Sequence, residues 1–225
     1  MKRIALVAGI AIAALFVSTS AEATSILLNG NFENNTAGST QFNMSNATFT
    51  ATVANATAFG TAQEIDLITS TDFGITPQSG NWKLGLHTQV GGPQDAFSFS
   101  LSSAVVGGTS YTLSFFGALL AGQPPGTIEV GISTSASSFG TLVYSATPFF
   151  TSQWQQLGNV FVAPSNASFL TVRTSAFEGY SFVDNFTLDP ASTAVPEPGT
   201  MTLLGVGLAA GAWRRLRSLR RRTIT

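Results

Sequence analysis

The middle of the chain consists of short segments in which apolar and polar residues alternate. The clearest of these segments are residues 97–101, 111–115, 128–132, 170–172 and 182–188. An alternation with a period of two is typical of a β-strand with one buried face, because successive side chains point to opposite sides of a strand. Glycine, proline and asparagine residues separate the segments, at 107–108, 122–126, 140 and 164–166. The pattern therefore predicts several strands joined by turns.

This spacing of strands favours an antiparallel β-sandwich of jelly-roll type. We predict an all-β domain over residues 24–190. The chain has no cysteine, and its 18 phenylalanines supply the bulk that a core without disulfides requires. Residues 34–62 are polar with irregularly spaced apolar positions, and here the pattern allows one or two strands or a long loop.

The N-terminus has the features of a secretory signal peptide helix over residues 1–23. Lys2 and Arg3 precede an apolar stretch from Ile4 to Val17, and Ala21-Glu22-Ala23 forms a small-x-small cleavage site. We expect cleavage between Ala23 and Thr24. The alternative is an uncleaved anchor helix, for which the stretch is short.

The C-terminus contains three consecutive features in a fixed order. A linker over residues 191–199 contains Pro196, Glu197 and Pro198; residues 200–213 are apolar, and residues 214–225 are rich in arginine. A helix of 14 residues is about 21 Å long, whereas the hydrocarbon core of a bilayer is about 30 Å thick. The sequence predicts a single, short transmembrane helix whose basic tail stays in the cytoplasm.

Charge is distributed unevenly along the chain. Residues 24–191 contain nine acidic residues and two basic ones, Lys83 and Arg173. Such an acidic body repels phosphate backbones, so nucleic acid is excluded as a partner. The arginine-rich tail directly follows the apolar segment, which excludes a nucleic-acid arm there as well.

The sequence offers little evidence for catalysis. His87 is the single histidine, and the G-x-S-x-G motif of serine hydrolases is missing. Glu64 and Asp66 would share one face of a strand, which leaves a carboxylate pair for glycan cleavage as an alternative to a solvated edge. We predict that the protein is not an enzyme.

Asp184 has the same parity as Tyr180, Phe182 and Phe186. On a regular strand its carboxylate would point to the aromatic side, where an ionised group needs a partner. A bound hard cation is one solution. A β-bulge that turns the residue towards solvent, or an Asx turn, is the alternative.

Five segments resemble the galactose-binding-like jelly roll of several carbohydrate-binding module families: "LLNGNFE" at 27–33, "SGNWKLGLHT" at 79–88, 96–119, 154–173 and "YSFVDNFTLDP" at 180–190. The resemblance implies a structural Ca²⁺ between the two ends of the domain, with Glu33 and Asp184 as ligands. It also implies that sugar stacks on exposed aromatic rings, for which the candidates are Trp82, Trp154, Tyr180 and Tyr144. Core or edge packing is the alternative for each ring.

The C-terminal segment "VPEPGTMTLLGVGLAAGAWRRLRSLRRR" resembles the PEP-CTERM sorting signal. The resemblance implies processing by an exosortase near Pro196-Glu197-Pro198, passage through an inner-membrane intermediate, and delivery to the cell surface or extracellular matrix. We therefore expect an exported, non-enzymatic module in contact with exopolysaccharide. A secreted glycan-active enzyme and a purely structural matrix protein are the alternatives.

Overall fold

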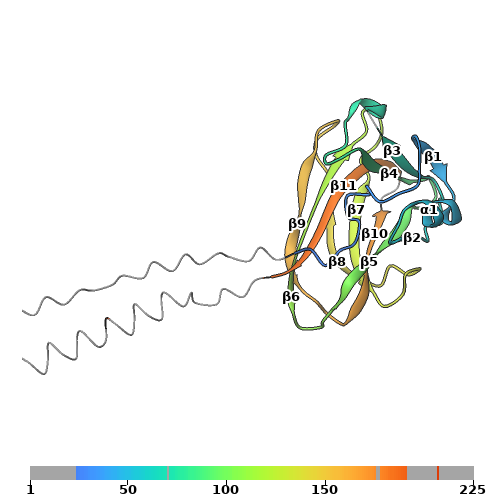
Figure 1. Ribbon diagram of the computed structural model, residues 1–225. Coiled ribbons are helices and arrows are strands. Elements are labelled where there is room, and N and C mark those ends of the chain that lie inside the picture. The colour runs from blue at the N-terminus through green and yellow to red at the C-terminus, as the bar shows by residue number, and fades with distance from the viewer. Residues whose placement is uncertain (1–23, 70, 176–177, 192–206, 208–225) are drawn as a thin grey trace, which may run out of the picture. The chain divides into compact units, whose positions relative to one another are not determined.

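The domain consists of two antiparallel sheets packed face to face (Figure 1). The computed structural model describes residues 24–69, 71–175, 178–191 and 207. Residues 23–191 form one compact unit, which contains both clusters of buried apolar side chains. The prediction of an all-β antiparallel sandwich is confirmed.

The first sheet has six strands in the order β1-β3-β4-β11-β6-β9. The strands are β1 (Gln41–Met44), β3 (Ile65–Thr69), β4 (Trp82–Thr88), β11 (Gly179–Pro190), β6 (Ser110–Leu119) and β9 (Gln155–Val162). The second sheet has five strands in the order β2-β5-β10-β7-β8. These are β2 (Ala56–Ala58), β5 (Ala96–Val105), β10 (Ala167–Ser175), β7 (Thr127–Ser133) and β8 (Thr141–Ala146).

The core between the sheets is built from the apolar positions of the alternating segments. Phe97 and Phe99 of β5 are fully buried, and Phe115 of β6 stacks on Phe186 of β11 with ring centroids 4.6 Å apart. Phe32 packs against Phe99 from the N-terminal segment. Aromatic contacts of this kind add to the free energy gained by removing the rings from water. Phenylalanine therefore provides most of the bulk, as the sequence predicts.

Strand β11 does not keep one parity along its length. Val183 belongs to the main core, whereas Phe182 belongs to a second, smaller cluster on the opposite face of the six-stranded sheet. The pairing of β11 with β6 shifts between Asp184 and Thr187, and Asn185 has a φ of 52°. This bulge changes the parity, so that Phe186 and Leu188 face the main core. The strand is therefore not regular, and the even positions from 180 to 188 do not all share one face; the β-bulge that the sequence left open as an alternative is present.

Residues 41–58 contain an element that the pattern does not predict. Between β1 and β2 lies helix α1 (Asn46–Thr52), which buries Phe49. Ser45 caps it, because its side chain accepts a hydrogen bond from the backbone N–H of Thr48. A 3₁₀ turn, η1 (Asp72–Gly74), lies in the connection between β3 and β4. No helix among the described residues has both the length and the apolar character needed to span a bilayer.

Candidate functional site

Glu33 and Asp184 lie far apart in the sequence, yet both bind the loop that precedes β4. The Glu33 carboxylate accepts hydrogen bonds from the backbone N–H groups of Asn81 (2.8 Å) and Trp82 (2.9 Å). The Asp184 carboxylate accepts from those of Gln78 (2.8 Å) and Ser79 (3.1 Å). The two residues that the sequence nominated together therefore hold opposite ends of one loop, residues 78–82.

The loop leaves no room for a side chain at its centre. Gly80 has a φ of +63°, and a Cβ atom there would lie 2.4 Å from the carboxylate carbon of Glu33. Glycine is the residue that adopts this backbone conformation without strain. Its missing side chain allows Glu33 to approach the backbone of the loop.

Asp184 is fully buried beside the bulge of β11. Desolvation raises the pKa of its carboxyl group to about 7, although hydrogen bonds from the N–H groups of Ser79, Asn185 and Gln78 oppose the shift. Of the two alternatives to a cation, the bulge is present, but it does not turn the side chain towards solvent. Backbone amides supply the partners that a buried carboxylate requires.

The arrangement does not fit a calcium ion bound by Glu33 and Asp184. Three of their four carboxylate oxygens accept short backbone hydrogen bonds, and an N–H group cannot serve as a cation ligand. Among residues 24–69, 71–175 and 178–191, no three His, Cys, Asp or Glu side chains come together as a metal site. The calcium ion stays a prediction from the resemblance. In this structure the carboxylates of Glu33 and Asp184 bind backbone N–H groups of the loop of residues 78–82.

The second apolar cluster contains two of the predicted sugar-stacking residues. Trp154 and Tyr180 pack against Phe182 and its neighbours on the outer face of the six-stranded sheet, and the indole N–H of Trp154 donates to the carbonyl of Thr76. Trp82 packs against the main core. All three rings thus have packing contacts within the domain, and their role in sugar binding stays a prediction.

Lys83 lies fully buried in the same region. Its ammonium group donates to the carbonyl of Asp72 and lies 5.6 Å from the centroid of the Phe182 ring. Desolvation lowers the pKa of Lys83 to about 8, while the charges of Asp72 and Asp184 oppose the shift. The negative charges of Asp72 and Asp184 therefore favour the protonated form of Lys83.

Glu64 and Asp66 belong to a polar network that also includes His87, Asp95 and Tyr180. His87 Nδ1 lies 2.9 Å from a carboxylate oxygen of Glu64, and the Tyr180 hydroxyl donates to Asp66. Asp95 is buried and accepts from the backbone N–H groups of Glu64 and His87. Both members of the predicted carboxylate pair therefore have specific partners within the domain.

The outer face of the five-stranded sheet is covered by the loop of residues 134–140. The hydroxyl of Ser98 donates to the carbonyl of Ala136, and that of Thr171 donates to the carbonyl of Phe139. Arg173 pairs with Glu129 at 2.6 Å, and its guanidinium group lies 3.9 Å from the centroid of the Phe139 ring. This face is closed by the protein's own loop.

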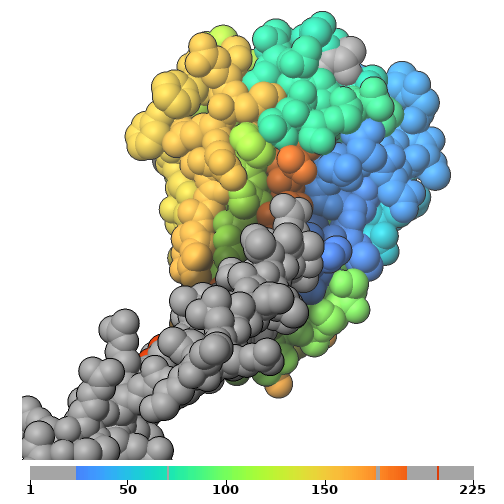
Figure 2. Space-filling view, turned by 60° about the vertical axis from the view of Figure 1, so that its left-hand side comes forward, coloured from blue at the N-terminus to red at the C-terminus, as the bar shows by residue number. Residues whose placement is uncertain are grey.

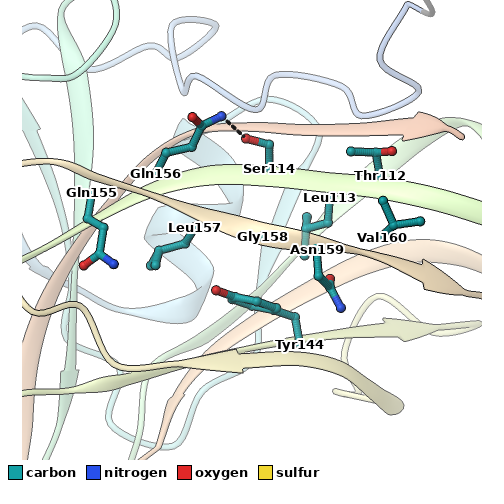
Figure 3. Close-up of a pocket in the computed structure, with 10 residues that line it drawn as sticks. All are labelled: Thr112, Leu113, Ser114, Tyr144, Gln155, Gln156, Leu157, Gly158, Asn159 and Val160. Carbon is teal, nitrogen blue, oxygen red and sulfur yellow. Dashed lines mark hydrogen bonds between the residues drawn. The ribbon is translucent and has the colours of Figure 1, made fainter.

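A groove of about 530 Å³ lies at the edge of the sandwich where β9 ends the six-stranded sheet (Figure 3). Strands β6 and β9 supply most of its lining, and β8 supplies Tyr144. In Figure 3, Gln156 and Ser114 lie on one side of β9, whereas Tyr144 and Asn159 lie on the other. We refer to it as the β9 groove; its lining residues are Thr112, Leu113, Ser114, Tyr144, Gln155, Gln156, Leu157, Gly158, Asn159 and Val160.

The polar groups of the β9 groove are uncharged amides and hydroxyls. The side-chain amide of Gln156 donates to the hydroxyl of Ser114 at 2.9 Å, and this bond holds the Gln156 side chain in place (Figure 3). The Asn159 amide makes a longer bond, 3.4 Å, to the carbonyl of Val143. Tyr144 packs edge-on against Phe115, which fixes its ring. The groove therefore presents uncharged donors and acceptors on both sides of β9: Gln156 and Ser114 lie on one side, and Asn159 lies with the Tyr144 ring on the other.

Gly158 shapes this groove from within β9. Its φ is +135°, and a Cβ atom would lie 2.1 Å from the carbonyl oxygen of Leu113. The missing side chain leaves a gap between Gln156 and Val160 in the row of side chains along the strand.

Of these residues, the sequence nominated Tyr144 alone as a candidate. The amide residues of β9 give no signal by themselves, because polar residues are normal on an exposed strand. The concentration of three amides at positions 155, 156 and 159 is the feature that draws attention to this strand. Strand β9 lies close to Tyr144 because the six-stranded and five-stranded sheets pack against each other. The spacing of these residues in the sequence does not predict this proximity.

Residues 194–217 match the PEP-CTERM protein-sorting motif. The match includes Pro196, Glu197 and Pro198, and the resemblance seen in the sequence is confirmed. The motif implies export and a cell-surface or extracellular location for an exosortase substrate. The predicted signal peptide with its Ala23–Thr24 cleavage site, the PEP motif, the apolar segment 200–213 apart from residue 207, and the basic tail lie outside the described residues.

The solved structures that resemble the domain include an adhesin domain and carbohydrate-binding modules. The K2 cleaved adhesin domain of Lys-gingipain is 17% identical over 73% of this chain and 99% of its own, with a TM-score of 0.51. The tandem CBM22-1–CBM22-2 domain of Paenibacillus barcinonensis Xyn10C is 15% identical over 80% of this chain and 49% of its own, with a TM-score of 0.45. TmCBM61, solved with β-1,4-galactotriose, is 13% identical over 74% of this chain and 99% of its own, with a TM-score of 0.44. No curated protein matches the sequence significantly.

Proposed function

We propose that this chain is an exported surface or matrix protein whose domain binds a neutral glycan in the β9 groove without cleaving it. An exosortase processes its C-terminal signal after a transient inner-membrane stage, and the mature domain then contacts exopolysaccharide. The observation that carries the proposal is the chemistry of the groove. Amide and hydroxyl groups match the hydroxyls of a sugar, and Tyr144 offers an aromatic ring on the side of β9 where Asn159 lies.

The lining also supports binding over catalysis. Glycoside hydrolysis generally uses two carboxyl groups that flank the scissile bond. No carboxylate is among the described residues that line the groove. Glu64 and Asp66, the pair that the sequence offered for catalysis, are engaged with His87 and Tyr180 instead.

The proposal is tested by glycan arrays and by exopolysaccharide pull-down with residues 24–191. We expect retention by neutral polysaccharide, and weaker retention of the double variant Gln156→Ala/Asn159→Ala. Gln41→Ala is the matched control, because Gln41 is exposed on β1, outside the groove. Equal retention of the double variant and the wild type, or no retention of either, would reject the β9 groove as a glycan site.

A further inference from the structure

Two unprotected strand edges lie together on one side of the sandwich. Within the described residues, β9 pairs with β6 alone and β8 pairs with β7 alone, so that each strand ends its sheet. Figure 2 shows the yellow and amber atoms of this region gathered on one side of the domain. Unpaired edges of this kind are templates for another strand unless charge, proline or a cover blocks them.

No charge protects this side of the molecule. The sequence has no charged residue between Glu129 and Arg173, a span that includes β8, β9 and their connection. Much of the exposed apolar surface of the described residues lies in the same span. Its large exposed apolar side chains are Leu142, Phe149, Phe150, Val160 and Val162, with exposed fractions between 50% and 80%. Protected edges normally carry lysine or other charges at such positions.

The charge of the domain indicates what pairs with this edge. Six of its nine acids precede residue 130, the other three lie within β11 or just before it, and two bases oppose them. Two copies of so acidic a domain repel each other in most relative orientations. The span from 130 to 172 has no charged residue, so contact through this span brings no like charges together. An antiparallel edge is self-complementary about a two-fold axis, because each copy presents the same pattern of N–H and C=O groups.

We propose that β9 pairs with β9 of a second copy, so that two six-stranded sheets join across a two-fold axis. Val160 and Val162 are 63% and 61% exposed in the single chain, and in the pair they lie against the neighbouring copy. Val160 also lines the β9 groove, so a second copy and a glycan compete for this edge. The association is measured without any glycan, so that each proposal can fail alone.

The test is light scattering with size-exclusion chromatography on residues 24–191, over a wide range of protein concentration. We expect a mass that rises with concentration and levels off at twice that of the chain. Val160→Lys and Val162→Lys each place a lysine of one copy close to the same lysine of the other across the two-fold axis, and each is expected to raise the dissociation constant by about tenfold or more. Both side chains point to solvent, so the variants should keep the wild-type circular dichroism spectrum.

Val90→Lys is the matched control, since Val90 is 60% exposed in a loop outside β8 and β9. It is expected to associate as the wild type does. A mass that stays monomeric, association that grows without limit, or lysine variants indistinguishable from the control would overturn the proposal. It would also be overturned if the domain stayed monomeric but bound a peptide of residues 192–225, because the edge would then hold the chain's own tail.

Discussion

At the scale of single residues, buried carboxylates organise the outer part of the six-stranded sheet. Asp184 and Glu33 fix the loop of residues 78–82, and Asp95 joins the segment before β3 to β4. In each case a carboxylate replaces water as the acceptor for backbone N–H groups. A buried N–H group left without an acceptor costs about 1–3 kcal/mol, which gives these residues measurable effects.

Asp184→Ala is expected to destabilise the domain by about 2–4 kcal/mol, because it removes the acceptor of three backbone N–H groups and leaves a cavity. Urea unfolding measures the change. Glu178→Ala removes one negative charge at a half-buried position just before β11, and it controls for the change in net charge. Equal midpoints for the two variants would show that Asp184 does not hold the loop.

The raised pKa of Asp95 leads to a prediction of how the free energy of unfolding changes with pH. Burial raises the pKa of its carboxyl group from 3.8 to about 6, so the folded state holds this proton more tightly than the unfolded state does. Its contribution to stability is therefore greatest below pH 3.8 and is lost as pH rises through 6. Burial raises the pKa values of Asp66 and Asp184 as well, so they act in the same direction.

We expect the free energy of unfolding to fall from about pH 5 to about pH 8, with roughly 1 kcal/mol of the fall due to Asp95. Denaturant unfolding across this range measures the slope. Asp95→Asn should flatten it in part, since the amide does not titrate. A wild-type stability that increases with pH over this range would contradict the assignment.

At the scale of secondary-structure elements, β9 determines both the groove and the free edge. Its pairing with β6 passes through Gly158, whose positive φ and close contact with Leu113 exclude a side chain. Gly158→Ala is expected to cost more than about 2 kcal/mol, because the added methyl group meets backbone atoms. Gly38→Ala is the matched control, since a Cβ atom at Gly38 has no neighbour within 4 Å. Thermal unfolding of the two variants compares them, and equal midpoints would mean that the β6–β9 pairing tolerates a side chain.

The elements also show how far the sequence could predict the structure. Alternation correctly placed β5, β6, β7, β10 and β11, because each has one face in the core. It missed the helix α1, which has Phe49 as its single buried residue and several threonines, so that the Ser45 cap was the available signal. It could not predict the bulge after Asp184, because a parity change depends on pairing with β6. Glu33 and Asp184 were nominated together through resemblance, but their shared loop became visible in three dimensions alone.

At the scale of the whole molecule, the predicted structural calcium can be tested on the intact domain. A ligand that binds the folded state alone raises the unfolding midpoint. Because three of the four carboxylate oxygens of Glu33 and Asp184 already accept backbone N–H groups, we predict the same melting temperature with calcium and with a chelator. A higher midpoint in calcium, lost in Asp184→Asn, would instead establish the ion there.

The chain combines a sorting motif at residues 194–217 with a domain that presents a groove lined by uncharged residues. The sorting motif implies export and a cell-surface or extracellular location. The acidic body disfavours phosphate-rich partners, and the groove offers uncharged amides, hydroxyls and one ring.

The most direct test is calorimetric titration of residues 24–191 with the oligosaccharide that an array selects. We predict saturable binding that weakens by about tenfold in Gln156→Ala/Asn159→Ala. This factor corresponds to the loss of about 1.4 kcal/mol of polar contacts. The affinity of Gln41→Ala should equal that of the wild type. Binding that is absent, or equal in all three proteins, would contradict this prediction.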